Sequence, residues 1–265
     1  MSKKFLIKIT FIIVLFLICL LLGFIVFNPY FLKKNFENGI LPFADKNQNT
    51  IFTINKVVFF SSCDAKNKAS SATNFTIENL YQYTDIALFI NSPNSNKDLE
   101  NTLKKVSINN IKYTTLPIIG EQKLYFKSIN QFANSNLVDE NIIEDSLDFS
   151  VTSEYLSDLS TPILYNNLAN PITLSYTNQN LKTDYTITDT SSPITYDGSL
   201  LKTCGILLNS LSCKLSFDII ITNNLNQEFK STVFLDIPLE NEEKSIYDGN
   251  VVKNENVNFT FYRYK

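Results

Sequence analysis

The chain has 265 residues and a net charge of −3, with no histidine and no tryptophan. Because histidine is absent, the sequence excludes Ser-His-Asp and Cys-His catalysis and histidine-ligated zinc. Arg263 is the only arginine, and no block of basic residues is interleaved with aromatic ones. Nucleic-acid binding depends on neutralising phosphate charge, so we expect no nucleic-acid partner.

An uncharged apolar run covers residues 9–27, and Thr10 is its only polar residue. As a helix with a rise of ~1.5 Å per residue, the run is about 28 Å long, close to the ~30 Å hydrocarbon core of a bilayer. Bulky residues over 23–30 do not form the small-residue site at which a signal peptide is cleaved. Residues 1–31 are therefore predicted to be a cytoplasmic tip and a transmembrane signal-anchor.

Positive charge predicts the orientation of this anchor. Three lysines precede the apolar run and two follow it closely (Lys3, Lys4 and Lys8; Lys33 and Lys34). Basic residues tend to stay in the cytoplasm, and the α-amino group adds to the N-terminal side. We therefore predict a single-pass protein of the plasma membrane, with a cytoplasmic N-terminus and extracytoplasmic C-terminal domains. Residues 32–49 are polar, with Gly39 and Pro42 as breakers, and are expected to form a stalk.

From residue 50 onward the sequence predicts short strands with turn signals every ~8–12 residues, the spacing typical of a β-sandwich. We expect a first sandwich domain at 50–138, with strands at 51–60, 85–91, 102–113 and 124–127 and a polar loop at 61–73. A polar, acidic stretch over 133–146 indicates the boundary to a second sandwich domain at 145–265. The expected fold class is all-β, with an N-terminal transmembrane helix and two tandem β-sandwich domains.

The clearest pattern lies in the second half, where apolar and polar residues alternate over 211–222. Side chains of a strand point to opposite faces in turn, so this pattern predicts a long half-buried strand. With turn residues at 223–226 and a partner at 229–237 it predicts a β-hairpin. Further strands are expected at 147–152, 170–176, 181–189, 200–208 and 257–264, with a turn at 177–180.

This succession of short strands in the second domain resembles an immunoglobulin-like sandwich. The resemblance rests on the pattern alone, because the domain has no core tryptophan and Leu211-Ser212-Cys213 stands where a Tyr-x-Cys element would fall. It implies an architecture, and a shared fold by itself does not carry a function.

Cys204 and Cys213 lie close enough in sequence to form a disulfide, which an oxidising exterior permits. The alternative is that both are small apolar core residues, since free cysteine is commonly buried. Cys63 stands in the predicted polar loop and has no partner in either case.

Other residues match catalytic or metal-binding patterns only in part. Ser199 and Lys202 form Ser-x-x-Lys, which needs a helix to bring lysine and serine together, whereas a strand is expected here. Four aspartates near turns are candidates for calcium binding or glycosidase chemistry, without the spacing of a calcium loop: Asp184, Asp189, Asp197 and Asp248. We therefore predict no catalytic residue, no metal and no cofactor.

Aromatic residues suggest a binding role. Tyr81, Tyr83, Tyr113 and Tyr125 lie in or near predicted strands, where their rings can stack on sugars or pack half-buried in a sheet. We expect a non-catalytic binding or scaffolding protein, integral to the membrane, whose partner is a surface protein or a cell-wall glycan. The alternatives are a cell-wall or glycan-binding module, which needs a row of exposed tyrosines, and a carboxylate-based hydrolase, which needs two buried acids in one cleft.

Overall fold

The computed structural model describes residues 14–16, 51–68, 74–92, 99–115, 119–152, 163–165, 171–188, 194–237 and 245–263. The chain divides into two compact units, Met1–Asn49 and Thr50–Lys265. In the first unit the described residues, 14–16, are helical, and the rest of the predicted anchor and stalk lies outside the described residues. Within the described ranges, no helix combines the length and the apolar character needed to cross a bilayer.

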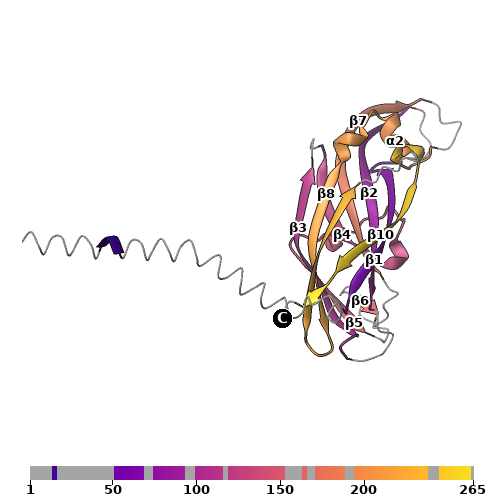
Figure 1. The fold of residues 1–265 in the computed structure, drawn as a ribbon. Helices are drawn as coiled ribbons and strands as arrows, with labels where there is room; N and C mark the ends of the chain where they lie inside the picture. Colours follow the sequence, from indigo (N-terminus) through magenta and orange to yellow (C-terminus); the bar gives the residue numbers. More distant parts are fainter. Residues whose placement is uncertain are drawn as a thin grey trace, which may run out of the picture. The chain divides into compact units, whose positions relative to one another are not determined.

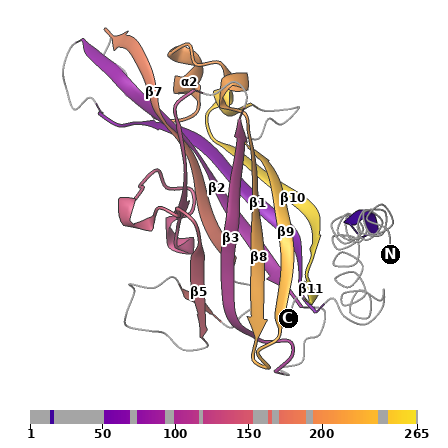
Figure 2. The same ribbon diagram turned by 90° about the vertical axis from the view of Figure 1, so that its left-hand side faces the viewer.

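The second unit is built from two β-sheets (Figures 1 and 2). Sheet A is antiparallel and has the strand order β10-β1-β2-β7-β4. Its strands are β1 (Thr53–Ala65), β2 (Phe75–Asn91), β4 (Glu121–Phe126), β7 (Ile172–Ile187) and β10 (Val251–Thr260).

Sheet B has the order β11-β9-β8-β3-β5-β6 and is antiparallel except for the parallel pair β5–β6. Its strands are β3 (Leu103–Thr115), β5 (Leu147–Thr152), β6 (Ile163–Tyr165), β8 (Cys213–Asn223), β9 (Glu228–Ile237) and β11 (Tyr262–Arg263). Short helices connect the strands: η1 (Ile129–Gln131), η2 (Asp139–Asn141), α2 (Ser199–Thr203), η3 (Leu208–Leu211) and η4 (Ile246–Asp248).

Alternation of apolar residues explains how the sheets pack. Phe217 and Ile219 of β8 and Ile86 and Leu88 of β2 are fully buried in one cluster that takes residues from both sheets. The predicted hairpin is confirmed, because β8 and β9 pair along their whole length. The two sheets therefore form a β-sandwich with a shared apolar interior.

The expected division into two tandem sandwiches, 50–138 and 145–265, does not hold. Strand β2 pairs with β7, and β3 pairs with β8, so each sheet takes strands from both halves of a single compact unit, Thr50–Lys265. Alternation identifies a strand and its buried face, but the strand's partner depends on contacts far away in the sequence. The acidic stretch over 133–146 lies in the connection between strands β4 and β5 of the one sandwich.

Two further segments differ from the prediction. The expected turn at 177–180 lies inside the single strand β7, where Thr177 and Asn178 pair with both β2 and β4. Asn180 has a φ of 57° next to a shift in the β2–β7 register, so the polar residues mark a bulge. Residues 200–208, expected as a strand, include most of helix α2 and the start of η3.

Strand β1 continues through residues 61–65, which we had assigned to a polar loop. Ser61, Ser62 and Asp64 are buried there, and each has a hydrogen-bond partner: Thr84 for Ser61, Asn250 for Ser62 and Lys68 for Asp64. Burying a polar side chain is tolerated when it is hydrogen-bonded, and a polarity pattern does not reveal such partners.

Candidate functional site

A buried charge pair lies on the outer face of sheet A. Ile86 and Leu88 of β2 point into the shared core, so Asp85 points to the opposite face. The neighbouring strand β7 places Ser175 directly across from Asp85. Ser175 Oγ donates a hydrogen bond of 2.6 Å to Asp85 Oδ1. The sheet register therefore fixes both the face and the first partner of this carboxylate.

Lys127 reaches the same face from the end of β4. Its backbone N–H donates to the Thr173 carbonyl oxygen at 3.1 Å, which extends the pairing of β4 with β7 by one step. Leu124 points into the core, so Lys127, three residues later, points outward. Lys127 Nζ lies 2.8 Å from both Oδ1 and Oδ2 of Asp85. The side chains of Lys127 and Asp85 are 2% and 0% exposed.

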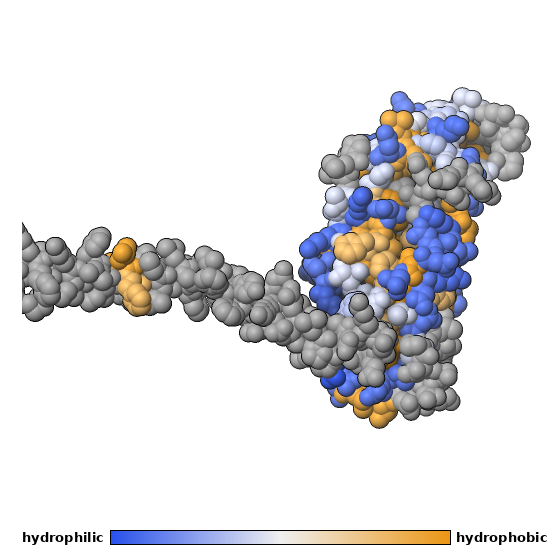
Figure 3. Space-filling model, in the orientation of Figure 1, coloured by the Kyte–Doolittle hydropathy of each residue, from blue (hydrophilic) through white to orange (hydrophobic). Residues whose placement is uncertain are grey.

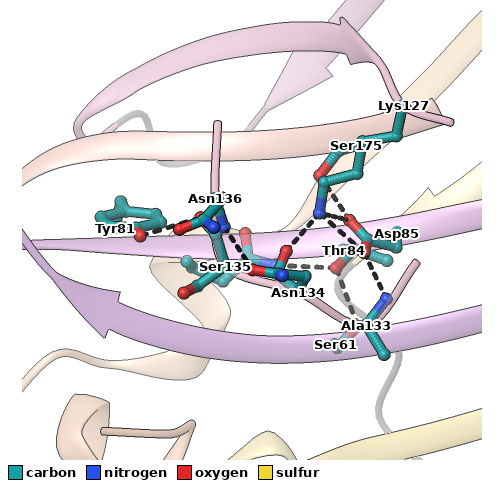
Figure 4. Close-up of polar contacts among 11 residues, drawn as sticks. Ser61, Tyr81, Thr84, Asp85, Lys127, Ala133, Asn134, Ser135, Asn136 and Ser175 are labelled. Carbon is teal, nitrogen blue, oxygen red and sulfur yellow. Dashed lines mark hydrogen bonds and ion pairs between the residues drawn. The ribbon is translucent and has the colours of Figure 1, made fainter. Parts of the chain in front are cut away.

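Residues 128–136 lie over this pair and bond to it (Figure 4). The backbone N–H of Ala133 donates to Asp85 Oδ2 at 2.8 Å, and Lys127 Nζ donates to the Asn134 carbonyl oxygen. Tyr81 Oη donates to the Ser135 carbonyl oxygen at 3.0 Å. We call residues 128–136 the cover segment, because their backbone closes the outer face of the sheet over the ion pair.

Burial shifts the pKa values of the pair against their charged forms. Removal from water raises the pKa of Asp85, opposed by the charge and hydrogen bonds of Lys127 and by the bond from Ser175. Removal from water likewise lowers the pKa of Lys127, opposed by Asp85. Both pKa shifts favour transfer of a proton from Lys127 to Asp85, which leaves the two groups neutral. The ring of Tyr83, 5.2 Å from Nζ, faces the lysine cation and favours its charged form.

A second polar layer lies inside the sandwich, on the inner face of sheet A. Ser61 Oγ and Thr84 Oγ1 are 2.7 Å apart, and Gln82 Nε2 donates to Thr84 Oγ1 at 2.7 Å. The layer separates the shared core from a second apolar cluster around Cys63 and Leu80. Its side chains link β1 to β2 in addition to the backbone hydrogen bonds between these strands, and so help to hold β2, which carries Asp85, in place.

The three described cysteines have free thiols in the structure. Cys213 belongs to the shared core and Cys204 packs against the second cluster, so the possible disulfide is not formed here. Cys63, which we had placed in a polar loop, is fully buried in β1. Burial raises the pKa of the Cys63 thiol well above its ordinary value, which makes it a poor nucleophile.

The Ser-x-x-Lys motif lies on a helix, contrary to expectation, because Ser199 opens α2 and Lys202 is in its last turn. Ser199 Oγ donates to Asp197 Oδ1 at 2.6 Å, in a bond local to the turn. Asp248 bonds the Ser245 N–H in a capping box of η4. Asp184 is exposed, and Asp189 lies outside the described residues.

Metal binding by the described residues would need a group of side chains that can hold the ion. No group of three or more His, Cys, Asp or Glu side chains among these residues is arranged to hold a metal ion. Each of the three buried aspartates is instead paired with a lysine: Asp64 with Lys68, Asp85 with Lys127, and Asp218 with Lys230. These carboxylates therefore act in separate ion pairs.

The four tyrosines considered for sugar stacking do not form an exposed row. Tyr83 and Tyr125 are 4% and 1% exposed, and burial raises the pKa of Tyr83 to about 12. Tyr81 is half-buried and bonded to the cover segment. Tyr113 lies on the other sheet, at 37% exposure. The rings near Asp85 pack as an outer layer of sheet A.

Asp85 and Lys127 belong to no motif in the sequence. One signal was present: Asp85 is a charged residue next to an alternating run of apolar residues that ends at Asn91. A charge at such a position needs a partner when the strand is covered on both faces. The identity of that partner, Lys127, follows only from the pairing of β4 with β7.

Comparison with known proteins adds no relative, because no family model matches the chain and no curated protein or solved structure is significantly similar to it. The geometry of the sandwich is therefore the basis on which a function is assigned.

Proposed function

We propose that the chain is a single-pass protein of the plasma membrane whose sandwich lies outside the cytoplasm and binds or scaffolds other molecules without catalysis. The apolar run over 9–27, with lysines before it, supports the anchor. The side chains of Val14, Leu15 and Phe16 are 47–63% exposed on a helical segment. Apolar side chains presented in this way favour an apolar surrounding, such as a bilayer.

The observation that carries the non-catalytic assignment is the closure of the Asp85–Lys127 site. Its charged atoms bond to Ser175, Ala133 and Asn134 of the chain itself. Both side chains are almost fully buried. A catalytic carboxylate has to reach a substrate, whereas this one holds the cover segment on sheet A. The site therefore supports a structural role inside a binding module.

The proposed working surface lies along neighbouring strands at one side of the sandwich. Strand β10 is an edge of sheet A and lies against β9 of sheet B (Figure 2). Phe234 on β9 is 68% exposed and Tyr262 on β11 is 45% exposed, both on the outer face of sheet B. Val252 on β10 is 59% exposed and points to the outer face of sheet A at the same edge. Figure 3 shows hydrophobic residues gathered between hydrophilic ones on one face of the sandwich. Exposed apolar side chains of this size favour a protein partner at the cell surface.

The likeness to an immunoglobulin-like sandwich belongs to this proposal as a description of the scaffold. Its support is the pair of packed, mainly antiparallel sheets with a central hairpin, β8–β9. Binding proteins of many kinds use such sandwiches, so the likeness by itself names no ligand.

The test is trypsin shaving of intact cells, followed by a blot for the C-terminal region. Lys33, Lys34 and Lys46 offer cut sites in the predicted stalk. We expect release of a fragment of about 25 kDa, in proportion to 30.3 kDa for the whole chain. The control is the same digestion after lysis. Protection in intact cells with cleavage only after lysis places the sandwich in the cytoplasm and overturns the proposal.

A further inference from the structure

We propose that Lys127 and Asp85 condense to a side-chain amide, which joins β2 covalently to the chain that follows β4. The reaction involves the sandwich alone and does not depend on where in the cell the sandwich lies. It starts from the placement of the reacting atoms: Lys127 Nζ is 2.8 Å from each oxygen of the Asp85 carboxylate. The amine nitrogen is thus held next to Cγ, the atom that it attacks.

Amine and carboxylic acid do not condense readily in water, where both are charged and hydrated. Here the pair is almost fully removed from water, and a buried ion pair pays a large desolvation penalty that a neutral amide does not. Burial raises the pKa of Asp85 and lowers that of Lys127, so both shifts favour the neutral forms. One proton that moves from Nζ to the carboxylate within the existing hydrogen bonds gives the neutral amine and the neutral acid.

The neighbouring groups are arranged for the bond changes that follow. The Nζ lone pair attacks Cγ, and the Ala133 N–H, bonded to Oδ2, stabilises the charge that develops on that oxygen. The Cγ–Oδ1 bond then breaks. Oδ1, which accepts the hydrogen bond from Ser175, leaves as water with the proton of the acid and one proton from Nζ. The reaction consumes no oxidant or reductant, and its products are one amide and one water.

The product keeps two of the hydrogen bonds of the ion pair, whereas the bond from Ser175 to Oδ1 is lost with the water. The amide N–H retains the Asn134 carbonyl oxygen as its acceptor. The amide oxygen retains the Ala133 N–H as its donor. No polar atom of the amide is left without a partner, which is what a buried polar group requires. Released water is the only group that has to leave the site.

The test is the intact mass of the full-length protein, folded in detergent micelles and denatured for measurement. We expect a mass about 18 Da below that of the unmodified chain, the loss of one water. In the Lys127→Arg variant, which keeps the positive charge but is not an acylation nucleophile, we expect no deficit. The matched control is Lys230→Arg, because Lys230 bonds Asp218 at 2.8 Å but is 36% exposed; this variant retains the deficit.

A tryptic map of the wild-type protein locates the bond and does not require any variant to fold. Trypsin cuts an unmodified chain after Lys127, whereas an acylated lysine resists cleavage. We expect the peptide 124–182, uncut at Lys127, to be joined to the peptide 69–97 that contains Asp85. A wild-type protein of full mass, cut after Lys127, overturns the proposal. A deficit that persists in Lys127→Arg also overturns it, because the water is then lost elsewhere, for instance at the Asp197-Gly198 sequence.

Discussion

The Asp85 site on sheet A has a counterpart on sheet B, built from the same kinds of groups. Asp218 of β8 points away from the shared core, as Asp85 does. It accepts hydrogen bonds from Lys230 Nζ at 2.8 Å, from Thr232 Oγ1 at 2.6 Å and from Asn110 Nδ2 at 3.0 Å. Each aspartate thus has one lysine, one hydroxyl and one amide N–H as partners.

The two sites differ in how far the chain covers them. The cover segment closes the outer face of sheet A over Lys127, which is 2% exposed, whereas Lys230 is 36% exposed. Burial raises the pKa of Asp85. Burial acts in the same direction on Asp218, but the hydrogen bonds from Lys230, Thr232 and Asn110 outweigh it and lower the pKa of that carboxyl. The comparison teaches that access of water, more than the set of partners, decides which form of the carboxyl the fold favours.

The largest expected effect comes from removing one lysine at each site. Lys127→Met leaves a buried carboxylate without its cation, so we expect a loss of about 3–5 kcal/mol in the free energy of unfolding. Lys230→Met leaves a carboxylate that still has two donors and some access to water, and we expect a loss of about 1 kcal/mol or less. Denaturant unfolding of the full-length proteins in micelles, followed by tyrosine fluorescence, measures both.

A double variant sharpens this result. In Lys127→Met with Asp85→Leu, the pair is replaced by apolar side chains of similar size and no charge stays buried, so part of the loss in the single variant should be recovered. The recovery is incomplete, because the Ser175 hydroxyl and the Ala133 N–H lose their acceptor. Equal losses in Lys127→Met and Lys230→Met would show that the cover segment does not keep water from the Asp85 site, and the contrast between the sheets would fail.

The next prediction concerns acid. Asp218 has a folded pKa below its ordinary value of 3.8, so it contributes stability that is present above the unfolded pKa and is lost as the pH falls through the folded pKa. Asp85 has a folded pKa above 3.8, so its contribution has the opposite sign: it is present below the unfolded pKa and is lost as the pH rises through the folded pKa. A carboxyl converted to an amide contributes nothing at either pH.

We therefore expect different responses of two variants to a change from about pH 6 to about pH 3. Asp218→Asn should lose less unfolding free energy over this interval than the wild-type protein. Asp85→Asn should lose at least as much as the wild type. Denaturant unfolding at the two pH values checks both. If Asp85→Asn makes the protein less sensitive to acid, the charged form of Asp85 stabilises the fold as that of Asp218 does, and the assigned direction of its pKa shift is wrong.

The sequence predicted the strands better than their arrangement. Alternation over 211–222 gave β8 and its hairpin with β9, because side-chain direction in a strand is a local property. The polar run at 177–180 was misassigned as a turn, since Thr177 and Asn178 are buried between β2 and β4. Whether a polar residue ends a strand or lies inside a sheet depends on neighbours that are distant in sequence.

The same limit applies to the site. Asp85 and Ser175 are brought together by the pairing of β2 with β7, and Lys127 joins them through the pairing of β4 with β7. None of these residues forms a motif with another along the chain. The Ser-x-x-Lys motif shows the converse: Ser199 and Lys202 have a suggestive spacing, but Ser199 bonds Asp197 within its own turn.

The smallest expected effect lies in the cover segment itself. Ala133 has a φ of 63°, and the other described non-glycine residues with positive φ are all asparagine, which tolerates this conformation better: Asn74, Asn110, Asn180 and Asn226. Ala133→Gly relieves about 1–2 kcal/mol of backbone strain and costs about 0.4–1 kcal/mol through the entropy of the unfolded chain. The N–H that bonds Asp85 is retained. We expect a net gain of about 0.5–1 kcal/mol in unfolding free energy, and a smaller gain for the control Asn180→Gly.

If Ala133→Gly instead destabilises the protein, the alanine methyl group contributes packing that holds the cover segment over Lys127, and the closure of the site depends on that side chain as well as on the backbone.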